Sequence, residues 1–304
     1  MTYCVGFCVK EGLVFASDSR TNAGVDYVTS YSKMHVFTPA NDRVFVLLSA
    51  GNLATTQEIV NRINRDIDYP DGGQNLFSAR YLFEAADYIG KISQEVQESH
   101  SAALQASGVS GEVSLILGGQ IQGQDHSLIL IYPQGNYIEA SENTPYLQIG
   151  ETKYGKPVLD RVVTYDMPPE DVARLALVSL SSTAKSNITV GPPFELAVYR
   201  NNQFKIDSRC RFEENGEYLQ GLDEAWRKGL MQAFINLPRF EWEVNQQNPQ
   251  NPTEGSQGQL QAQAGLVQAQ QPTPPMHPQN HQQIQQSTNN PPSVLPCGAS
   301  GKEP

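Results

Sequence analysis

The chain has 304 residues and a formal net charge of −11, and hydrophobic residues make up 39% of it, enough for a substantial core. Acidic residues outnumber basic ones by 32 to 21 and the basic residues are scattered, so we expect no nucleic-acid partner, because phosphates are bound by clustered Lys and Arg. No apolar stretch approaches the length that spans a bilayer, which argues against a membrane partner.

The first half of the chain contains the signals of four strands and two helices. Apolar runs rich in strand-forming residues predict strands at Thr2–Val9, Leu13–Ser17, Met34–Phe37 and Val44–Ala50. Apolar residues at helical spacing predict helices at Asn52–Ile67 and Leu76–Leu104.

The second half repeats this order of strands followed by helices. Strands are expected at Val113–Gln120, Ser127–Tyr132 and Tyr137–Ala140, and helices at Tyr154–Val162 and Pro169–Lys185. A hairpin of Phe194–Arg200 with Phe204–Asp207 and a last helix at Glu217–Ile235 are expected after them. Strands linked by hairpins form antiparallel sheets, so we predict an α+β fold, a four-layer α/β/β/α sandwich with helices outside two antiparallel sheets.

Composition changes near Glu243. Before this residue the chain reads as mixed globular sequence, and after it Gln, Asn, Pro, Gly and Ser dominate. A segment of this kind cannot bury enough apolar surface to order itself. We therefore predict one folded domain over residues 1–243 and a disordered Gln/Pro-rich tail over 244–304. An alternative role for the tail is to dock a partner through its proline-rich pieces.

Common catalytic and metal-binding motifs are missing from the chain. It contains no GxSxG, HExxH, Walker A or GxGxxG pattern. Of the five histidines, His277 and His281 lie in the tail, and His35, His100 and His126 have no ligand spacing around them. We therefore expect no metal and no cofactor, and we interpret the three histidines outside the tail as structural or surface residues.

The four cysteines form no CxxC pair and no regular framework, and the chain opens without a charged and apolar leader. Disulfide frameworks and export signals are typical of secreted proteins. Their absence from the sequence favours a cytoplasmic location.

Thr2 is the strongest candidate for a nucleophile. A small residue after the initiator Met normally allows Met1 to be removed, which would leave Thr2 with a hydroxyl and a free α-amino group. The reference pKa of an α-amino group is about 7.7–8.0, so it can act as a general base near neutral pH. A threonine paired with its own amine is a known way to activate a hydroxyl.

Two charged residues strengthen this hypothesis. The turn Lys10-Glu11-Gly12 folds the second strand back on the first, so Asp18 is expected within one or two positions of Thr2 across the ladder. Lys33 stands directly before another predicted strand. A lysine held by Asp18 would lower the free energy of a threonine alkoxide.

These residues resemble the proteasome β-subunit family of N-terminal-nucleophile (Ntn) hydrolases. The resemblance rests on Thr2, Ala16-Ser17-Asp18-Ser19-Arg20, Lys33 and Ser49-Ala50-Gly51, and it is greatest to the bacterial ancestral β-subunit branch, Anbu. Ser186-Asn187 followed by Thr189-Val190-Gly191 is also similar to that branch. The resemblance covers about residues 2–243.

The resemblance implies a role for each matching residue. Thr2 would be the nucleophile and, through its amine, the base. Lys33 would lower the pKa of the nucleophile, and Asp18 would hold Lys33 charged and oriented. The backbone N–H of Gly51 would contribute to the oxyanion hole. The family also implies a self-assembled homo-oligomer with no cofactor, which hydrolyses peptides or unfolded protein.

Two positions depart from the family pattern. Ile149-Gly150-Glu151 has Glu where the family has Ser, and Leu180-Ser181-Ser182-Thr183 lacks the expected Asp. Candidates for the supporting role are Arg20, Ser181, Ser182 and Ser186.

The sequence therefore predicts a threonine peptidase, and any ATPase that unfolds its substrate would be a separate chain. Two alternatives stay open: an Ntn amidase or amide-forming enzyme acting on small metabolites, and a non-catalytic scaffold of the same fold.

Overall fold

The computed structural model describes residues 2–22, 28–70 and 73–243. They belong to two compact units that divide after Met231, within the last helix. The strands are β1 (Tyr3–Val9), β2 (Gly12–Asp18), β3 (Arg20–Asn22), β4 (Val28–Ser30), β5 (Met34–Phe37), β6 (Arg43–Gly51), β7 (Val113–Ile121), β8 (Ser127–Ile131), β9 (Tyr137–Glu139), β10 (Tyr146–Gly150), β11 (Phe194–Arg200) and β12 (Ser208–Phe212). The helices are α1 (Leu53–Asp68), α2 (Leu82–Ala106), α3 (Lys156–Val162), α4 (Pro169–Ser186) and α5 (Glu217–Ile235).

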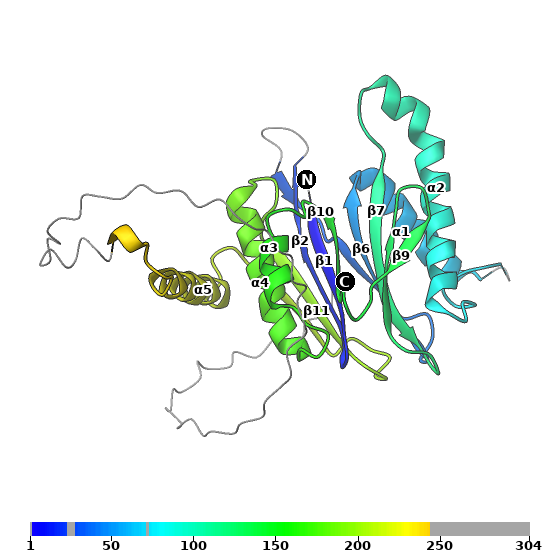
Figure 1. The fold of residues 1–304 in the computed structure, drawn as a ribbon. Helices are drawn as coiled ribbons and strands as arrows, with labels where there is room; N and C mark the ends of the chain where they lie inside the picture. The colour runs from blue at the N-terminus through cyan, green and yellow to red at the C-terminus, as the bar shows by residue number, and fades with distance from the viewer. Residues whose placement is uncertain (1, 23–27, 71–72, 244–304) are drawn as a thin grey trace, which may run out of the picture. The chain divides into compact units, whose positions relative to one another are not determined.

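The unit that ends at Met231 contains two five-stranded antiparallel sheets. One has the order β10-β1-β2-β11-β12 and the other the order β5-β6-β7-β8-β9, while β3 and β4 form a separate ribbon. Figure 1 shows α3 and α4 beside the first sheet and α1 and α2 beside the second. The predicted α+β sandwich of antiparallel sheets flanked by helices is confirmed.

Three separate hydrophobic clusters hold these layers together. On β1, Val5 and Phe7 pack with α3 and α4, whereas Cys4 points into the cluster between the sheets. On β6, Leu47 packs with α1 and α2, whereas Leu48 packs between the sheets. Alternate residues of a strand point to opposite faces, so strands buried on both faces read as continuous apolar runs.

The structure corrects several predicted boundaries. The predicted strand Phe204–Asp207 is wrong, because Phe204 has a φ of 52° and belongs to a turn, and the strand begins at Ser208. Helix α2 begins at Leu82 rather than Leu76, because the Asn75 side chain accepts the N–H groups of the next turn. Three strands, β3, β4 and β10, were not predicted.

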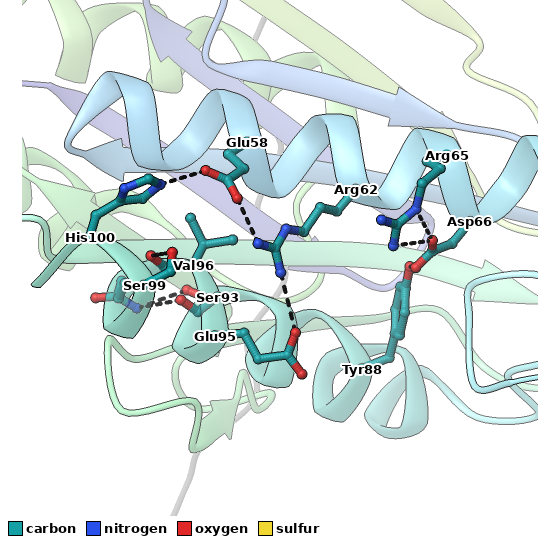
Figure 2. Close-up of polar contacts among 11 residues, drawn as sticks. Glu58, Arg62, Arg65, Asp66, Tyr88, Ser93, Glu95, Val96, Ser99 and His100 are labelled. Carbon is teal, nitrogen blue, oxygen red and sulfur yellow. Dashed lines mark hydrogen bonds and ion pairs between the residues drawn. The ribbon is translucent and has the colours of Figure 1, made fainter.

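A chain of exposed polar contacts links α1 to α2 on the outer surface (Figure 2). Glu58 accepts from Arg62 at 2.6 Å and contacts His100 at 2.7 Å. Arg62 also reaches Glu95 of α2 at 3.3 Å. These contacts connect the two helices above their shared apolar face.

No helix within the described ranges is both long enough and apolar enough to cross a lipid bilayer.

Candidate active site

Thr2 lies at the N-terminal end of β1, an internal strand of its sheet. It directly precedes β1, which is flanked by β10 and β2, and it is partly buried. Its carbonyl oxygen accepts the N–H of Glu151 at 2.7 Å. Gly150 permits this contact, because its φ is 82° and a Cβ there would lie 1.9 Å from the Thr2 oxygen. The β10 end therefore holds the backbone of Thr2 from one side.

Asp18 approaches from the other side, at the end of β2. The hairpin register pairs Cys4 with Ser17, so Tyr3 and Asp18 follow as the next pair. The Tyr3 N–H donates to Asp18 Oδ1 at 3.0 Å. Asp18 thus bonds to the residue that immediately follows the candidate nucleophile.

Lys33 reaches the same carboxylate from the second sheet. Its Nζ donates to Asp18 Oδ1 and to the Arg20 carbonyl oxygen, both at 2.7 Å. Its own carbonyl oxygen accepts the N–H of Ser49 on β6 at 3.0 Å. The pairing of β5 with β6 therefore positions the backbone of Lys33 so that its side chain reaches Asp18 on the other sheet.

This ion pair is shielded from water. The side chain of Asp18 is fully buried and that of Lys33 is 6% exposed. Burial raises the pKa of Asp18 above its ordinary value, while the Lys33 ammonium and the N–H groups of Tyr3 and Gly191 act in the opposite direction. An ammonium in such surroundings stabilises a developing negative charge more strongly than it would in water.

The loop after α4 closes over the pair. The Gly191 N–H lies 3.4 Å from Asp18 Oδ2. A Cβ on Gly191 would come within 2.3 Å of the Arg20 guanidinium, so a larger residue there would require the Arg20 side chain to shift. Arg20 donates to the Ile188 carbonyl oxygen at 3.0 Å and faces Glu214 at 3.8 Å. Arg20 therefore contributes a backbone acceptor to Lys33 and a side chain that anchors the loop.

Gly51 ends β6, two residues after Ser49. Its φ is 132°, and a Cβ there would lie 2.1 Å from the Glu112 carbonyl oxygen. The residue is exposed. The backbone at this position can take this conformation only with glycine.

The predicted supporting serines lie elsewhere. Ser181 is on α4 and its hydroxyl donates to Asp223 of α5 at 2.5 Å. Ser182 is half-buried on the same helix, and Ser186 is exposed at its end. Among the described residues, none of the three serines hydrogen-bonds to Thr2, Asp18 or Lys33.

Two other residues join the site that the sequence did not assign to it. Glu151, 6% exposed, accepts the amide of Asn187 at 2.8 Å. Asn187 in turn accepts from the N–H and hydroxyl of Thr189, at 3.0 and 2.6 Å. The sequence did contain a signal for Glu151. This carboxylate stands where the family has Ser, two residues after an apolar stretch.

The nearby thiols are poor competitors for the role of nucleophile. Cys4 is fully buried, and burial raises the pKa of its thiol well above the usual range. Burial raises the pKa of Cys8 to about 12. Because the thiolate is the reactive form, neither cysteine is activated near neutral pH. Within the described ranges, no group of three His, Cys, Asp or Glu side chains could hold a metal ion.

Comparison with solved structures gives close relatives. Anbu, the ancestral beta-subunit from Yersinia bercovieri, is 42% identical, and the match covers 79% of this chain and 99% of that one with a TM-score of 0.73. Anbu from Hyphomicrobium sp. strain MC1 is 42% identical, with 79% and 100% covered and a TM-score of 0.71. A helical assembly of the Anbu complex from Pseudomonas aeruginosa is 40% identical, with 80% and 100% covered and a TM-score of 0.75.

No curated protein matched the chain. The family model of the proteasome subunit matches residues 2–199, which begin at Thr2 and include Asp18, Lys33, Gly51 and Glu151. Together with the Anbu structures, this match confirms the resemblance noted in the sequence. The chain belongs to the proteasome subunit family.

Proposed function

We propose that the protein is a threonine peptidase whose nucleophile is Thr2, exposed as the first residue when Met1 is removed. The observation that carries the proposal is the buried contact of Lys33 with Asp18, which bonds to Tyr3 directly after Thr2. A buried ion pair adds little stability compared with apolar residues of the same size. Its place beside a candidate nucleophile is therefore better explained by chemistry.

The reaction would be acyl transfer in two halves. The Thr2 hydroxyl oxygen attacks the carbonyl carbon of the substrate amide, and the hydroxyl proton passes to the α-amino group. The C–N bond then breaks, and the leaving amine takes that proton. Water, deprotonated by the same α-amino group, then attacks the ester carbon on Thr2. As the bond to the Thr2 oxygen breaks, that oxygen takes the proton back from the amine and the acid is released.

The surrounding groups would stabilise the charges that develop during these steps. Lys33 places a positive charge near the Thr2 oxygen as it loses its proton, and Asp18 orients Lys33. The N–H of Gly51 would donate to the carbonyl oxygen of the tetrahedral intermediate. None of these steps uses a cofactor.

We also propose that the protein is cytoplasmic and acts as a homo-oligomer on peptides or unfolded protein. The relative from Pseudomonas aeruginosa forms a helical assembly, which supports self-association here. The unit after Met231 supports it independently. Its described residues include five large apolar side chains that are at least 60% exposed, and such patches commonly mark contact surfaces. They are Phe234, Ile235, Leu237, Phe240 and Trp242.

The variant Thr2→Ala tests the proposed activity. We expect hydrolysis of fluorogenic peptides to fall by at least about a thousandfold, because neither the hydroxyl nor a comparable nucleophile remains. Thr144→Ala, in an exposed turn, is the matched control and should retain wild-type activity. Turnover of small amides without peptides would favour the amidase alternative. Unchanged peptide hydrolysis in Thr2→Ala would rule out Thr2 as the nucleophile.

A further inference from the structure

The neighbourhood of Thr2 gains a positive charge in the course of the proposed reaction. Lys33 already occupies Oδ1 of Asp18 at 2.7 Å. When the α-amino group of Thr2 takes a proton during catalysis, a second cation appears beside Lys33. Two like charges in a site shielded from water repel each other strongly. A second carboxylate is therefore needed to stabilise the protonated amine.

Glu151 is an acidic residue whose backbone bonds to Thr2. The ladder of β1 with β10 ends at the pair Tyr3 and Gly150. Directly beyond this pair, the Glu151 N–H bonds to the Thr2 carbonyl oxygen at 2.7 Å. Thr2 and Glu151 are therefore in direct backbone contact at the end of the sheet.

The carboxylate of Glu151 is held in place by its neighbours and can accept further hydrogen bonds. The amide of Asn187 holds Oε2 at 2.8 Å, and Lys153, whose side chain is 67% exposed, lies 3.4 Å from Oε1. A carboxylate has about four acceptor sites, so further donors can be accommodated. Asn187 is itself oriented by two donors from Thr189. The loop after α4 therefore holds Glu151 in the way that it also holds Asp18 through Gly191.

We propose, resting on the function proposed above, that Glu151 is a positioning residue that binds and orients the free α-amino group of Thr2. It takes the place of the Ser and Asp that belong to the family pattern and that this chain lacks. Because the amine is neutral before the proton transfer and charged during it, this contact strengthens toward the transition state. Asn187 supports the contact by fixing the carboxylate.

The experiment uses the full-length chain after mass spectrometry shows Thr2 as its first residue. The apparent pKa of the α-amine is measured from the pH dependence of its acylation by acetic anhydride, followed on the N-terminal peptide. The charged groups of this neighbourhood include Asp18, Arg20, Lys33, Glu151 and Lys153, together with the buried Glu195, which accepts from Ser32. Only Glu151 is changed in the test variant.

Glu151→Gln keeps the shape and the acceptor for Asn187 but removes the charge. We expect the α-amine pKa to fall by about half a unit to one unit, since an opposite charge nearby favours the protonated form. The kcat for peptides should fall about tenfold with KM within about twofold, and the acid limb of the pH profile should move to lower pH. Glu142→Gln, an exposed residue before the opposite end of β10, is the control and should match the wild type.

A second variant covers the case in which Glu151→Gln fails to fold. Asn187→Ala leaves the carboxylate in place without its donor, and we expect a smaller change of kcat and α-amine pKa in the same directions. An α-amine pKa equal to that of the wild type in every folded variant would overturn the inference. Because acylation does not depend on turnover, it separates this outcome from failure of the proposed function, which Thr2→Ala reports.

Discussion

Two sets of charged side chains in this molecule have similar contact distances and opposite surroundings. Lys33 and Asp18 are 2.7 Å apart with almost no exposed surface. Between α1 and α2, Glu58 lies 2.6 Å from Arg62 and 2.7 Å from His100, with side chains between 28% and 49% exposed. Judged by distance alone, the two sets would be expected to contribute equally to stability.

The two sets differ in their exposure to water. Water and salt screen the exposed set, and pairs of that kind stabilise a protein by about 0–1 kcal/mol. Taking two charges out of water costs several kcal/mol, so the buried pair gains little net stability while it depends strongly on both partners. The comparison indicates that the surface set fixes two helices weakly, whereas the proposed chemistry at Thr2 would account for the buried pair.

Removing one partner of the buried pair should have the largest effect. We expect Lys33→Met to lower the free energy of unfolding by about 3–5 kcal/mol, because it leaves Asp18 buried without its cation. Urea unfolding at a fixed protein concentration measures this loss.

The same urea unfolding measurement provides the control for Lys33→Met and the result that would disprove the expectation. Lys153→Met, at an exposed lysine, should change the stability by less than about 1 kcal/mol. A loss in Lys33→Met as small as that of the control would show that the pair is not buried in the way described.

His35, two residues after Lys33 on β5, extends the comparison to a half-buried titratable group. Burial lowers the pKa of His35 from 6.5 to about 4, and Arg209 adds to this shift. The folded chain therefore resists protonation of His35, while the unfolded chain takes up the proton below pH 6.5. The stability from neutral His35 is complete above pH 6.5 and is lost as the pH falls toward 4.

We expect His35→Gln to lack this acid-dependent loss, which amounts to at most about 3 kcal/mol. Thermal unfolding of the wild type and the variant between pH 7 and pH 4 gives the difference directly. His100→Gln, in the exposed set, is the matched control and should follow the wild type. Parallel curves for the wild type and His35→Gln would contradict the burial of His35.

The smallest effect is expected on the surface. Arg62→Ala removes the contacts to Glu58 and Glu95, and we expect a loss of up to about 1 kcal/mol that shrinks in high salt. Urea unfolding at low and high NaCl concentrations measures both. A loss above about 2 kcal/mol that does not depend on salt would mean that this set behaves like the buried one.

Much of the fold was accessible from local patterns. β5 and α5 have the predicted bounds, because apolar periodicity and turn residues mark both of them clearly. β10 was missed, since a strand of five residues that follows an exposed turn and ends at Gly150 gives too short a signal. The predicted strand Phe204–Asp207 failed because nothing local reveals the positive φ of Phe204.

The candidate site also contains contacts that could be predicted from the sequence and contacts that could not. Asp18 could be placed near Thr2 because the turn after β1 fixes the hairpin register. The bonds of Glu151 to Thr2 and Asn187 could not, because they depend on β10 and on a loop far away in sequence. Ser181 was a candidate from its sequence position alone, and the structure pairs it with Asp223 instead.

Thr2 acts, in the proposed function, as a free N-terminal nucleophile. The most direct measurement of this property is the intact mass and first residue of the purified protein, before and after treatment with a threonine-directed covalent inhibitor. We expect a chain that begins at Thr2 and gains one adduct on that residue. A chain that keeps Met1 and gains no adduct would contradict it and favour a non-catalytic scaffold.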